Sequence, residues 1–172
     1  MKHILSVSRR SDIPAFYGEW FLQKVRDGNV TLSSPFSNRI QSVSLCPEDV
    51  SAIVFWSKNY QPFLPILKQI KPLYNGRFLF HLTMNGFSGL AKILLEPGAP
   101  DTEKALKTAH LLCDEYGSGK ILWRFDPIIF SNLTPPEERL EAFSKLAEQL
   151  RGLTQRCYVS FVDLYGKVKR RF

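Results

Sequence analysis

The sequence has few cysteines and no long apolar run, and both absences limit what the protein can be. Its three cysteines, Cys46, Cys113 and Cys157, lie far apart and form no Cys-x-x-Cys pair, so they predict neither a metal site nor a redox motif. The three histidines also lack the spacing of metal ligands. No segment approaches the ~20 apolar residues of a membrane span. The apolar run after Met1 is too short for a signal peptide, and we expect a protein of the cytoplasm with no membrane segment.

Several common catalytic and nucleotide-binding motifs are missing as well. A glycine-rich dinucleotide fingerprint and a Walker loop are absent. The segment at residues 116–119 contains Gly-Ser-Gly, but its spacing and its place after a predicted helix exclude a nucleophile elbow. The function therefore has to be inferred from residues that the fold brings together.

The composition is that of an ordinary globular protein with a basic C-terminal end. The chain has 172 residues, of which 44% are hydrophobic and 23% charged, enough for one domain with a core. Four cations in the last seven residues, Lys167, Lys169, Arg170 and Arg171, account for part of the net charge of +7, which falls to +3 without them. Charge alone is therefore a weak argument for nucleic-acid binding.

Apolar patterns along the chain predict strands and helices in alternation. Strands are expected at residues 4–8, 52–56, 78–84, 121–127 and 157–164, and helices at 16–27, 62–73, 101–116 and 134–152. Residues 30–34 and 40–45 form either a hairpin or irregular extended segments, and residues 86–100 a long loop. This order is typical of an α/β fold whose parallel strands are joined by right-handed crossovers, in an open sheet or in part of a barrel.

The last predicted helix carries a strong start signal. Thr134 is expected at the N-cap, Pro135 at the first helical position and Glu137 in a capping box. The expected inward stripe consists of Leu140, Phe143, Leu146, Ala147 and Leu150.

The chain ends just after a predicted strand, with no covering helix, which is unusual for a parallel edge strand. We therefore expect one α/β domain over residues 1–165, incomplete at its C-terminus, followed by a basic tail over residues 166–172.

The strand at residues 121–127 has the most informative pattern. Because side chains alternate across a strand, Ile121, Trp123 and Phe125 share one face, and Leu122, Arg124 and Asp126 share the other. The two charges lie at the C-terminal end of the strand, where parallel α/β folds bind ligands. They form either a structural ion pair or part of a site.

Polar residues also lie at the ends of the other predicted strands. We expect Arg124, Asp126 and His81 to be catalytic, with His81 as the proton-transfer candidate. The expected ligand-binding residues are Arg9, Arg10, Asp12, Lys58, Asn59, Thr83, Asn85, Ser160 and Asp163. If the strands are parallel, these groups converge and suit a small anionic or nucleotide-like ligand. Each also has a structural alternative: a solvated loop for Arg9 and Arg10, a surface position for Lys58, a satisfied core histidine for His81, and a turn cap for Asp163.

Several blocks of the sequence resemble a known family. These are Ser-Arg-Arg-Ser-Asp-Ile-Pro-Ala-Phe-Tyr from Ser8, Ile-Val-Phe-Trp-Ser-Lys-Asn from Ile53, Trp-Arg-Phe-Asp-Pro-Ile-Ile from Trp123 and Ser-Phe-Val-Asp-Leu-Tyr from Ser160. Together they resemble domain-of-unknown-function family 1848, a family of uncharacterised prokaryotic proteins. The resemblance implies a partial TIM-like (β/α) barrel similar to radical S-adenosylmethionine enzymes.

The resemblance also implies a cofactor for longer proteins. Members of the family carry a C-terminal cysteine cluster, which implies a [4Fe–4S] cluster and S-adenosylmethionine. This chain stops before such a cluster, and Cys46, Cys113 and Cys157 do not replace it. We expect this chain alone to be inactive in radical chemistry, and the family supplies no reaction to carry over.

Two other interpretations stay open. One is a non-catalytic nucleic-acid-binding module that uses the basic tail and exposed aromatic residues. The other is a folding unit that needs a missing half.

Overall fold

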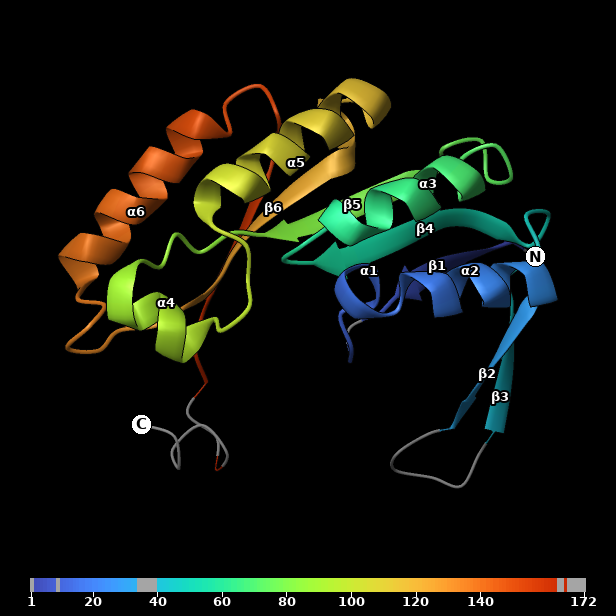
Figure 1. Ribbon diagram of the computed structural model, residues 1–172, viewed down its shortest axis with the longest axis horizontal. Coiled ribbons are helices and arrows are strands. Elements are labelled where there is room, and N and C mark those ends of the chain that lie inside the picture. Colours follow the sequence, from blue (N-terminus) through green and yellow to red (C-terminus); the bar gives the residue numbers. More distant parts are fainter. Residues whose placement is uncertain (1, 9, 34–39, 164–165, 167–172) are drawn as a thin grey trace. The chain divides into compact units, whose positions relative to one another are not determined.

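The computed structural model describes residues 2–8, 10–33, 40–163 and 166 (Figure 1). The chain divides into two compact units, residues 1–81 and residues 82–172. The first unit contains β1 (His3–Val7), α1 (Ile13–Phe16), α2 (Gly18–Asp27), β2 (Asn29–Ser33), β3 (Ile40–Ser44), β4 (Val50–Ser57), the 3-10 helix η1 (Gln61–Phe63) and α3 (Leu64–Ile70). Strand β5 (Phe78–Thr83) contains the boundary. The second unit contains α4 (Gly89–Leu95), α5 (Thr102–Tyr116), the 3-10 helix η2 (Ser118–Lys120), β6 (Ile121–Ile128), α6 (Pro136–Gln149) and β7 (Cys157–Phe161).

The main sheet has five strands in the order β1-β4-β5-β6-β7. Strand β1 pairs with β4 in parallel, and β6 pairs with β7 in parallel. The spatial order follows the chain order without a reversal, as in successive strands of a (β/α) barrel and unlike a doubly wound sheet. The prediction of an α/β fold with alternating strand–helix units and a parallel sheet is confirmed.

An aromatic cluster forms the core of the first unit. Alternate residues of β4 are buried, and Phe55 among them is fully enclosed. The Phe55 ring contacts Phe21 of α2, Phe63 of η1 and Phe78 and Phe80 of β5, with ring centroids 5.0–5.9 Å apart. Such contacts add to the hydrophobic gain of burial and explain why so many phenylalanines fall on these elements.

Strands β2 and β3 form an antiparallel hairpin, which resolves the alternatives for residues 30–34 and 40–45 within the described residues. The pairing runs from Asn29↔Ser44 to Ser33↔Ile40. At its base Leu45 N donates to Gly28 O at 2.8 Å. Gly28 has φ of 74°, a left-handed conformation that glycine adopts without strain and that ends α2.

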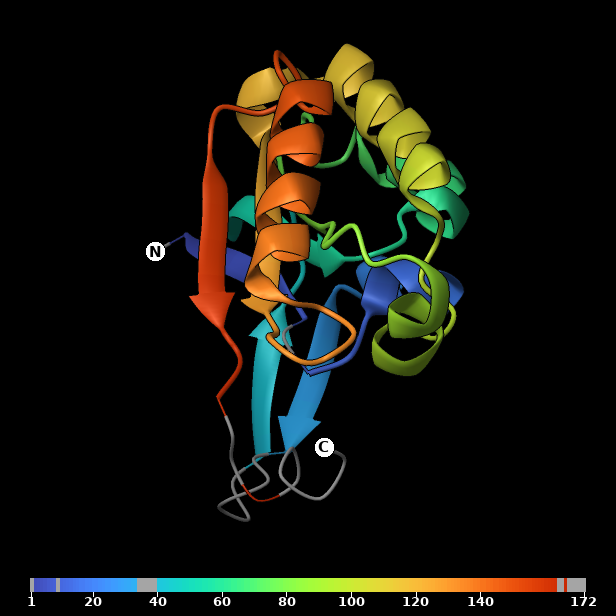
Figure 2. The same cartoon turned by 90° about the vertical axis from the view of Figure 1, so that its left-hand side faces the viewer.

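In the second unit, β6 shows the predicted alternation. Ile121, Trp123 and Phe125 are each at most 3% exposed, while Arg124 and Asp126 on the opposite face are partly buried. Trp123 and Phe125 pack on Phe143 of α6, with ring centroids 5.1 and 5.3 Å away. Figure 2 shows α6 lying along β6 and β7. The prediction of one aromatic and one polar face for this strand is confirmed.

Two local predictions in the second unit are wrong. Residues 86–100 are not only a loop, because they contain the short helix α4. The sequence pattern did not reveal this helix, since it lies between Gly86 and Gly98. Helix α6 begins at Pro136, one residue later than expected for a Thr134 N-cap. Thr134 instead forms a closed turn with Ser131, in which the backbone groups bond in both directions and the two hydroxyl oxygens lie 2.8 Å apart.

The expected inward stripe of α6 is confirmed at Leu146 and Leu150 and wrong at Leu140. Leu140 is 67% exposed, whereas Arg139 is 2% exposed. The buried positions Arg139, Leu146 and Leu150 lie on one side of the helix, because 3.6 residues make one turn.

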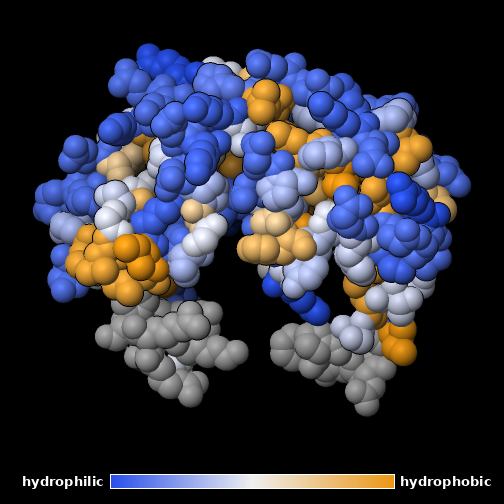
Figure 3. All heavy atoms as spheres, in the orientation of Figure 1, coloured by the Kyte–Doolittle hydropathy of each residue, from blue (hydrophilic) through white to orange (hydrophobic). Residues whose placement is uncertain are grey.

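The exposed apolar residues of the second unit include a group on α4. Leu90, Ile93 and Leu94 are 55–66% exposed, and Figure 3 shows this group as an apolar patch over the helix. Among the described residues, no helix is long and apolar enough to cross a membrane. The predicted basic tail lies outside the described residues except for Gly166, so the domain boundaries stay a prediction.

Candidate functional site

The polar residues at the end of β6 form a connected group in the second unit. The Arg124 guanidinium pairs with the Asp126 carboxylate, which also accepts a hydrogen bond from the Ser160 hydroxyl on β7. The Arg124 side chain is 22% exposed and that of Asp126 is 16% exposed. The guanidinium also lies 5.8 Å from the centre of the Tyr158 ring. Both charged side chains are therefore fixed by neighbours and reachable from solvent.

Asn85 fixes the backbone of this group. Its Oδ1 accepts from Asp126 N at 2.7 Å, and its Nδ2 donates to Asp126 O at 3.3 Å and to Glu96 Oε1 at 2.8 Å. Asn85 is 2% exposed, so its amide meets its hydrogen-bonding needs inside the protein. The following peptide bond, Asp126–Pro127, is cis. The structure thus brings together four of the residues predicted for the site: Asn85, Arg124, Asp126 and Ser160.

A buried arginine that sequence reasoning missed supports the same segment. Arg139 Nη1 donates to Asn85 O at 2.7 Å, and its guanidinium lies 4.3 Å from the centre of the Phe87 ring. Its charge is paired with Glu138 on the same helix. The only signal in the sequence is helical spacing. Arg139 lies one turn before Phe143 and two turns before Leu146, so it is on the same face of the helix as these two apolar residues.

Gly86 allows α6 to approach this segment closely. A Cβ at Gly86 would lie 3.0 Å from Leu146 Cδ1, and its φ is 64°. Any other residue would meet both a clash and backbone strain at this position. The close packing of α6 at Gly86 and the hydrogen bond from Arg139 thus hold Asn85 in place.

The remaining predicted residues of the second unit do not join the group by any described contact. Thr83 is half-buried near the end of β5, and Asp163 is exposed beyond β7. Both lie near the ends of their strands, as expected. Their role in ligand binding stays a prediction.

In the first unit, Asp12 caps a helix. Its Oδ1 accepts from Ala15 N at 3.0 Å at the start of α1, and its Oδ2 accepts from Lys58 N at 3.2 Å. Asn59 Oδ1 accepts from Gln61 N at 3.1 Å, which closes the turn into η1. The structure thus brings Asp12 and Lys58 together, and it gives Asp12 and Asn59 structural hydrogen bonds at the end of β4.

Of the two adjacent arginines of the first unit, the structure describes one. Arg10 is exposed, and its backbone N donates to Ser8 Oγ at 3.2 Å. Arg9 lies outside the described residues. Anion binding by these two side chains stays a prediction.

His81 is buried, as expected, at 7% exposure. Its ring stacks on Trp56, with the centroids 3.7 Å apart, and its carbonyl oxygen accepts from Tyr60 Oη at 3.0 Å. Burial, with a smaller effect of the Asp12 charge, holds the pKa of Tyr60 well above its ordinary value. Tyr60 is therefore a neutral donor, and the stack on Trp56 restricts the geometry in which His81 could transfer a proton.

The three cysteines do not fit an iron–sulfur cluster. Cys46 Sγ donates to Gly28 O at 3.5 Å, and Cys157 Sγ donates to Tyr158 O at 3.8 Å. Burial raises the pKa of the Cys157 thiol, although a hydrogen bond with the Phe125 backbone opposes this, and only thiolates bind such clusters. No group of three or more metal-binding side chains occurs in the part of the chain that the structure describes.

The fold and the polar group at the end of β6 define an α/β protein with parallel strands and a partly exposed Arg–Asp pair at a strand end. The family described as Domain of unknown function (DUF1848) matches residues 4–172, and the chain belongs to this family. The family resemblance inferred from the sequence is thereby confirmed. No curated protein and no solved structure matches the chain.

Proposed function

We propose that the chain binds a small nucleotide-like anion at the C-terminal end of β6, with Arg124 and Asp126 as its central contacts. The observation that carries the proposal is the Arg124–Asp126 pair, which is partly exposed and tied to Ser160. A guanidinium has five N–H donors, so Arg124 can serve Asp126 and a ligand oxygen at the same time. Ligands of parallel α/β folds bind at this end of the strands.

The charge of the pair narrows the class of ligand. Arg124 attracts an anion, but the neighbouring Asp126 carboxylate repels it and accepts hydrogen bonds. A ligand that offers both acidic oxygens and hydroxyl or amine donors satisfies both side chains. A nucleotide has donors on its ribose and base that are separate from its anionic phosphate, whereas the hydroxyl donors of inorganic phosphate are on the anion itself. The proposal therefore favours a nucleotide over phosphate.

The iron–sulfur chemistry implied by the resemblance is not part of this proposal. Because Cys46, Cys113 and Cys157 do not fit a [4Fe–4S] cluster, we assign no step to one. A cluster with S-adenosylmethionine is a proposal for longer proteins of the family. The three thiols are free, which supports the proposed location in a reducing cytoplasm.

Calorimetric titration tests the ligand site. The probes are AMP, S-adenosylmethionine and inorganic phosphate, each added to the wild type and to Arg124→Gln, Asp126→Asn and Lys107→Gln. The last variant is the matched control, because Lys107 is an exposed residue of α5 whose ammonium group forms an ion pair with Glu103 at 2.7 Å. We expect AMP to bind more tightly than phosphate, and Arg124→Gln to weaken binding about tenfold or more. Equal binding by Arg124→Gln and the wild type, with a lower stability of the variant, would show that the pair is structural only.

A further inference from the structure

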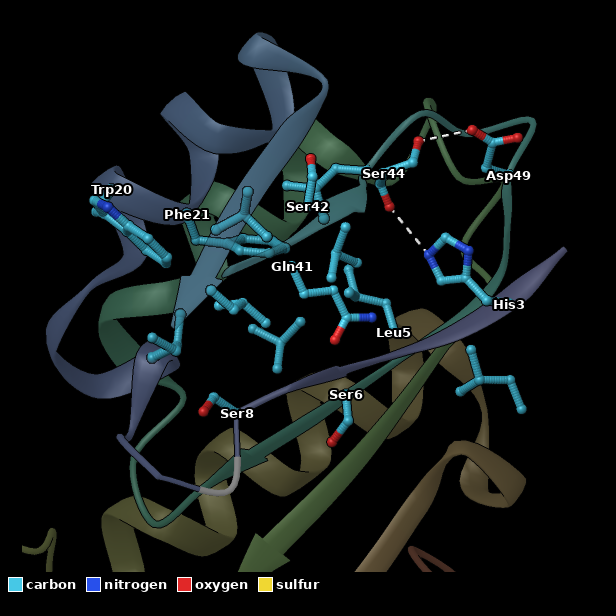
Figure 4. Close-up of a pocket in the computed structure, with 17 residues that line it drawn as sticks. His3, Leu5, Ser6, Ser8, Trp20, Phe21, Gln41, Ser42, Ser44 and Asp49 are labelled. Carbon is cyan, nitrogen blue, oxygen red and sulfur yellow. Dashed lines mark hydrogen bonds between the residues drawn. The ribbon is translucent and has the colours of Figure 1, made fainter. Parts of the chain in front are cut away.

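A cavity of about 690 Å³ lies in the first unit, and none of its described lining residues belongs to the proposed ligand site (Figure 4). It runs between β1 and the β2–β3 hairpin. Six consecutive residues, His3 to Ser8, line it on one side, and five consecutive residues, Gln41 to Leu45, line it on another. Because side chains alternate across a strand, consecutive residues can all line a cavity only where the edge of the strand itself faces it. The cavity thus lies along two strand edges.

The free edge of β3 can be assigned from the hairpin ladder. Leu45 N donates to Gly28 O at the base of the hairpin. Because hydrogen-bonded pairs alternate along an antiparallel ladder, Val43 and Gln41 are the residues of β3 whose backbone groups bond to β2. The backbone groups of Ser42 and Ser44 therefore point away from β2. The side chain of His3 confirms this direction, because its Nε2 lies 3.0 Å from Ser44 O and donates to it (Figure 4).

The free edge of β1 follows from its register with β4. Leu5 is in register with Ile53, and Ile53 N donates away from β1, to Arg77 O at 2.9 Å. In a parallel ladder, the residues of β4 before and after Ile53 therefore bond to the backbone of Leu5. The backbone groups of Ile4 and Ser6 then point away from β4. Strand β1 is also at the end of the sheet order. An edge of this kind is a template for another strand.

Much of the cavity lining is apolar. Leu5, Val7, Ile13, Phe21 and Leu45 line it, and each is at most 8% exposed. Trp20 and Leu32 line it too and are 45% and 50% exposed. These residues suit the alternate apolar side chains of an extended peptide.

The charge of the cavity selects among peptides. Among the lining residues that the structure describes there is one carboxylate, Asp49, and neither lysine nor arginine, although the chain as a whole has a net charge of +7. Asp49 Oδ2 accepts from Ser44 Oγ at 2.7 Å, so the carboxylate lies at the end where His3 joins the two strands. A cationic group of a ligand is favoured there, and an acidic one is repelled.

We propose that this cavity binds an extended peptide of another protein, which adds as a strand along the free edges of β1 and β3. The peptide carries apolar residues at alternate positions and a cationic residue at the end beside Asp49. Backbone hydrogen bonds supply the affinity in this mode of recognition, and the alternate side chains supply the specificity.

The proposal is tested with the fluorescently labelled peptide acetyl-Lys-Val-Thr-Val-Thr-Val-amide and fluorescence anisotropy on the full chain. One control peptide has N-methyl groups on alternate backbone nitrogens, which remove the donors and keep the side chains. A second control has Glu in place of Lys. We expect saturable binding of the first peptide and at least about tenfold weaker binding of both controls.

Two proline variants locate the site. Ser42→Pro removes an N–H that points to the cavity and spares the β2–β3 ladder, whereas Thr31→Pro removes the equivalent N–H on the outer edge of β2. Thr31 does not line the cavity. We expect only Ser42→Pro to weaken peptide binding, with both variants retaining the far-ultraviolet circular dichroism of the wild type. Equal affinity for the N-methylated peptide, equal effects of the two prolines, or no binding of the first peptide at millimolar concentration would each overturn the proposal.

Discussion

The indole ring of Trp56 on β4 and the imidazole ring of His81 on β5 are stacked, with centroids 3.7 Å apart and planes inclined by 3°. Trp56 Nε1 also donates to Ser6 Oγ on β1 at 3.0 Å, so one aromatic side chain connects three strands of the first unit. This contact places His81 in a packed layer. It favours the interpretation of His81 as a core histidine, which the sequence left as an alternative to proton transfer.

A double-mutant cycle measures this stack. We expect Trp56→Leu and His81→Leu each to lower the free energy of unfolding, because each removes a ring from a packed contact. The two effects should not add, and the coupling energy should be about 1 kcal/mol. Urea unfolding of the wild type, both single variants and the double variant gives this number. Strict additivity would show that the stack contributes nothing beyond burial.

Asp126 should matter more for stability than Ser160. Asp126→Asn removes the negative charge that balances the partly buried Arg124 side chain. We expect this variant to lower the free energy of unfolding by about 1–3 kcal/mol. Ser160→Ala removes one donor to the same carboxylate from an exposed position, and a loss of about 1 kcal/mol or less is expected. Urea midpoints of the two variants, at equal slopes, decide the order. The reverse order would contradict the described geometry.

Asn85 should be among the polar residues most sensitive to mutation. Asn85→Ala removes the side chain that bonds Asp126 N, Asp126 O and Glu96, and at 2% exposure water cannot easily replace it. We expect the free energy of unfolding to fall by about 2–4 kcal/mol, because several buried polar groups lose their hydrogen-bond partner together.

The matched control for Asn85→Ala is Asn132→Ala in an exposed turn, for which we expect a change within about 0.5 kcal/mol. Thermal and urea unfolding of both variants provide the comparison. Similar small losses for the two would mean that Asn85 does not hold the strand end.

Arg139 should not tolerate replacement by lysine. The planar guanidinium lies over Phe87 and donates to Asn85 O, and an ammonium group cannot reproduce both contacts. We expect Arg139→Lys to destabilise the protein by about 1–3 kcal/mol. Arg151→Lys at an exposed position is the control and should change stability by less than about 0.5 kcal/mol. The comparison uses urea unfolding at one pH.

Local periodicity explains which parts of the fold could be predicted from the sequence. In β6 the alternation of Trp123, Arg124 and Phe125 is a property of neighbouring residues, so the two faces were predicted correctly. Helix α4 was missed because it is only seven residues long and glycines surround it. A short helix is stabilised by tertiary contacts, such as the cluster of Ala91 with Ile129, and no local pattern contains such contacts.

The candidate site could be predicted only in part, for the same reason. Arg124 and Asp126 are two residues apart, and their pairing follows from one strand. Arg139 is 54 residues from Asn85 in the sequence, and a charged residue on a helix is usually exposed. Asp12 was assigned to a ligand, but its cap to Ala15 and its bond to Lys58 depend on where α1 begins and where β4 ends.

Tyr74 should make the protein sensitive to alkaline pH. Its hydroxyl is buried and donates to Leu45 O at 2.5 Å, and burial raises its pKa to about 12, with smaller effects from the charges of Cys46 and Glu48. The folded state then binds the phenolic proton more tightly than the unfolded state, whose pKa is about 10. The associated stability is fully present below pH ~10 and is lost as the pH rises towards ~12, by up to about 2.7 kcal/mol.

Comparison with Tyr74→Phe isolates this effect from other groups that titrate at high pH. At pH 8 we expect the variant to be less stable than the wild type by about 1–3 kcal/mol, because Leu45 O loses its donor. Between pH ~10 and ~12 the wild type should lose stability faster than the variant, so the difference between them should shrink. Urea unfolding of both proteins at pH 8, 9, 10 and 11 measures the trend. A difference that stays constant over this range would mean that the Tyr74 hydroxyl titrates alike in the folded and unfolded states, and that its burial has no electrostatic consequence.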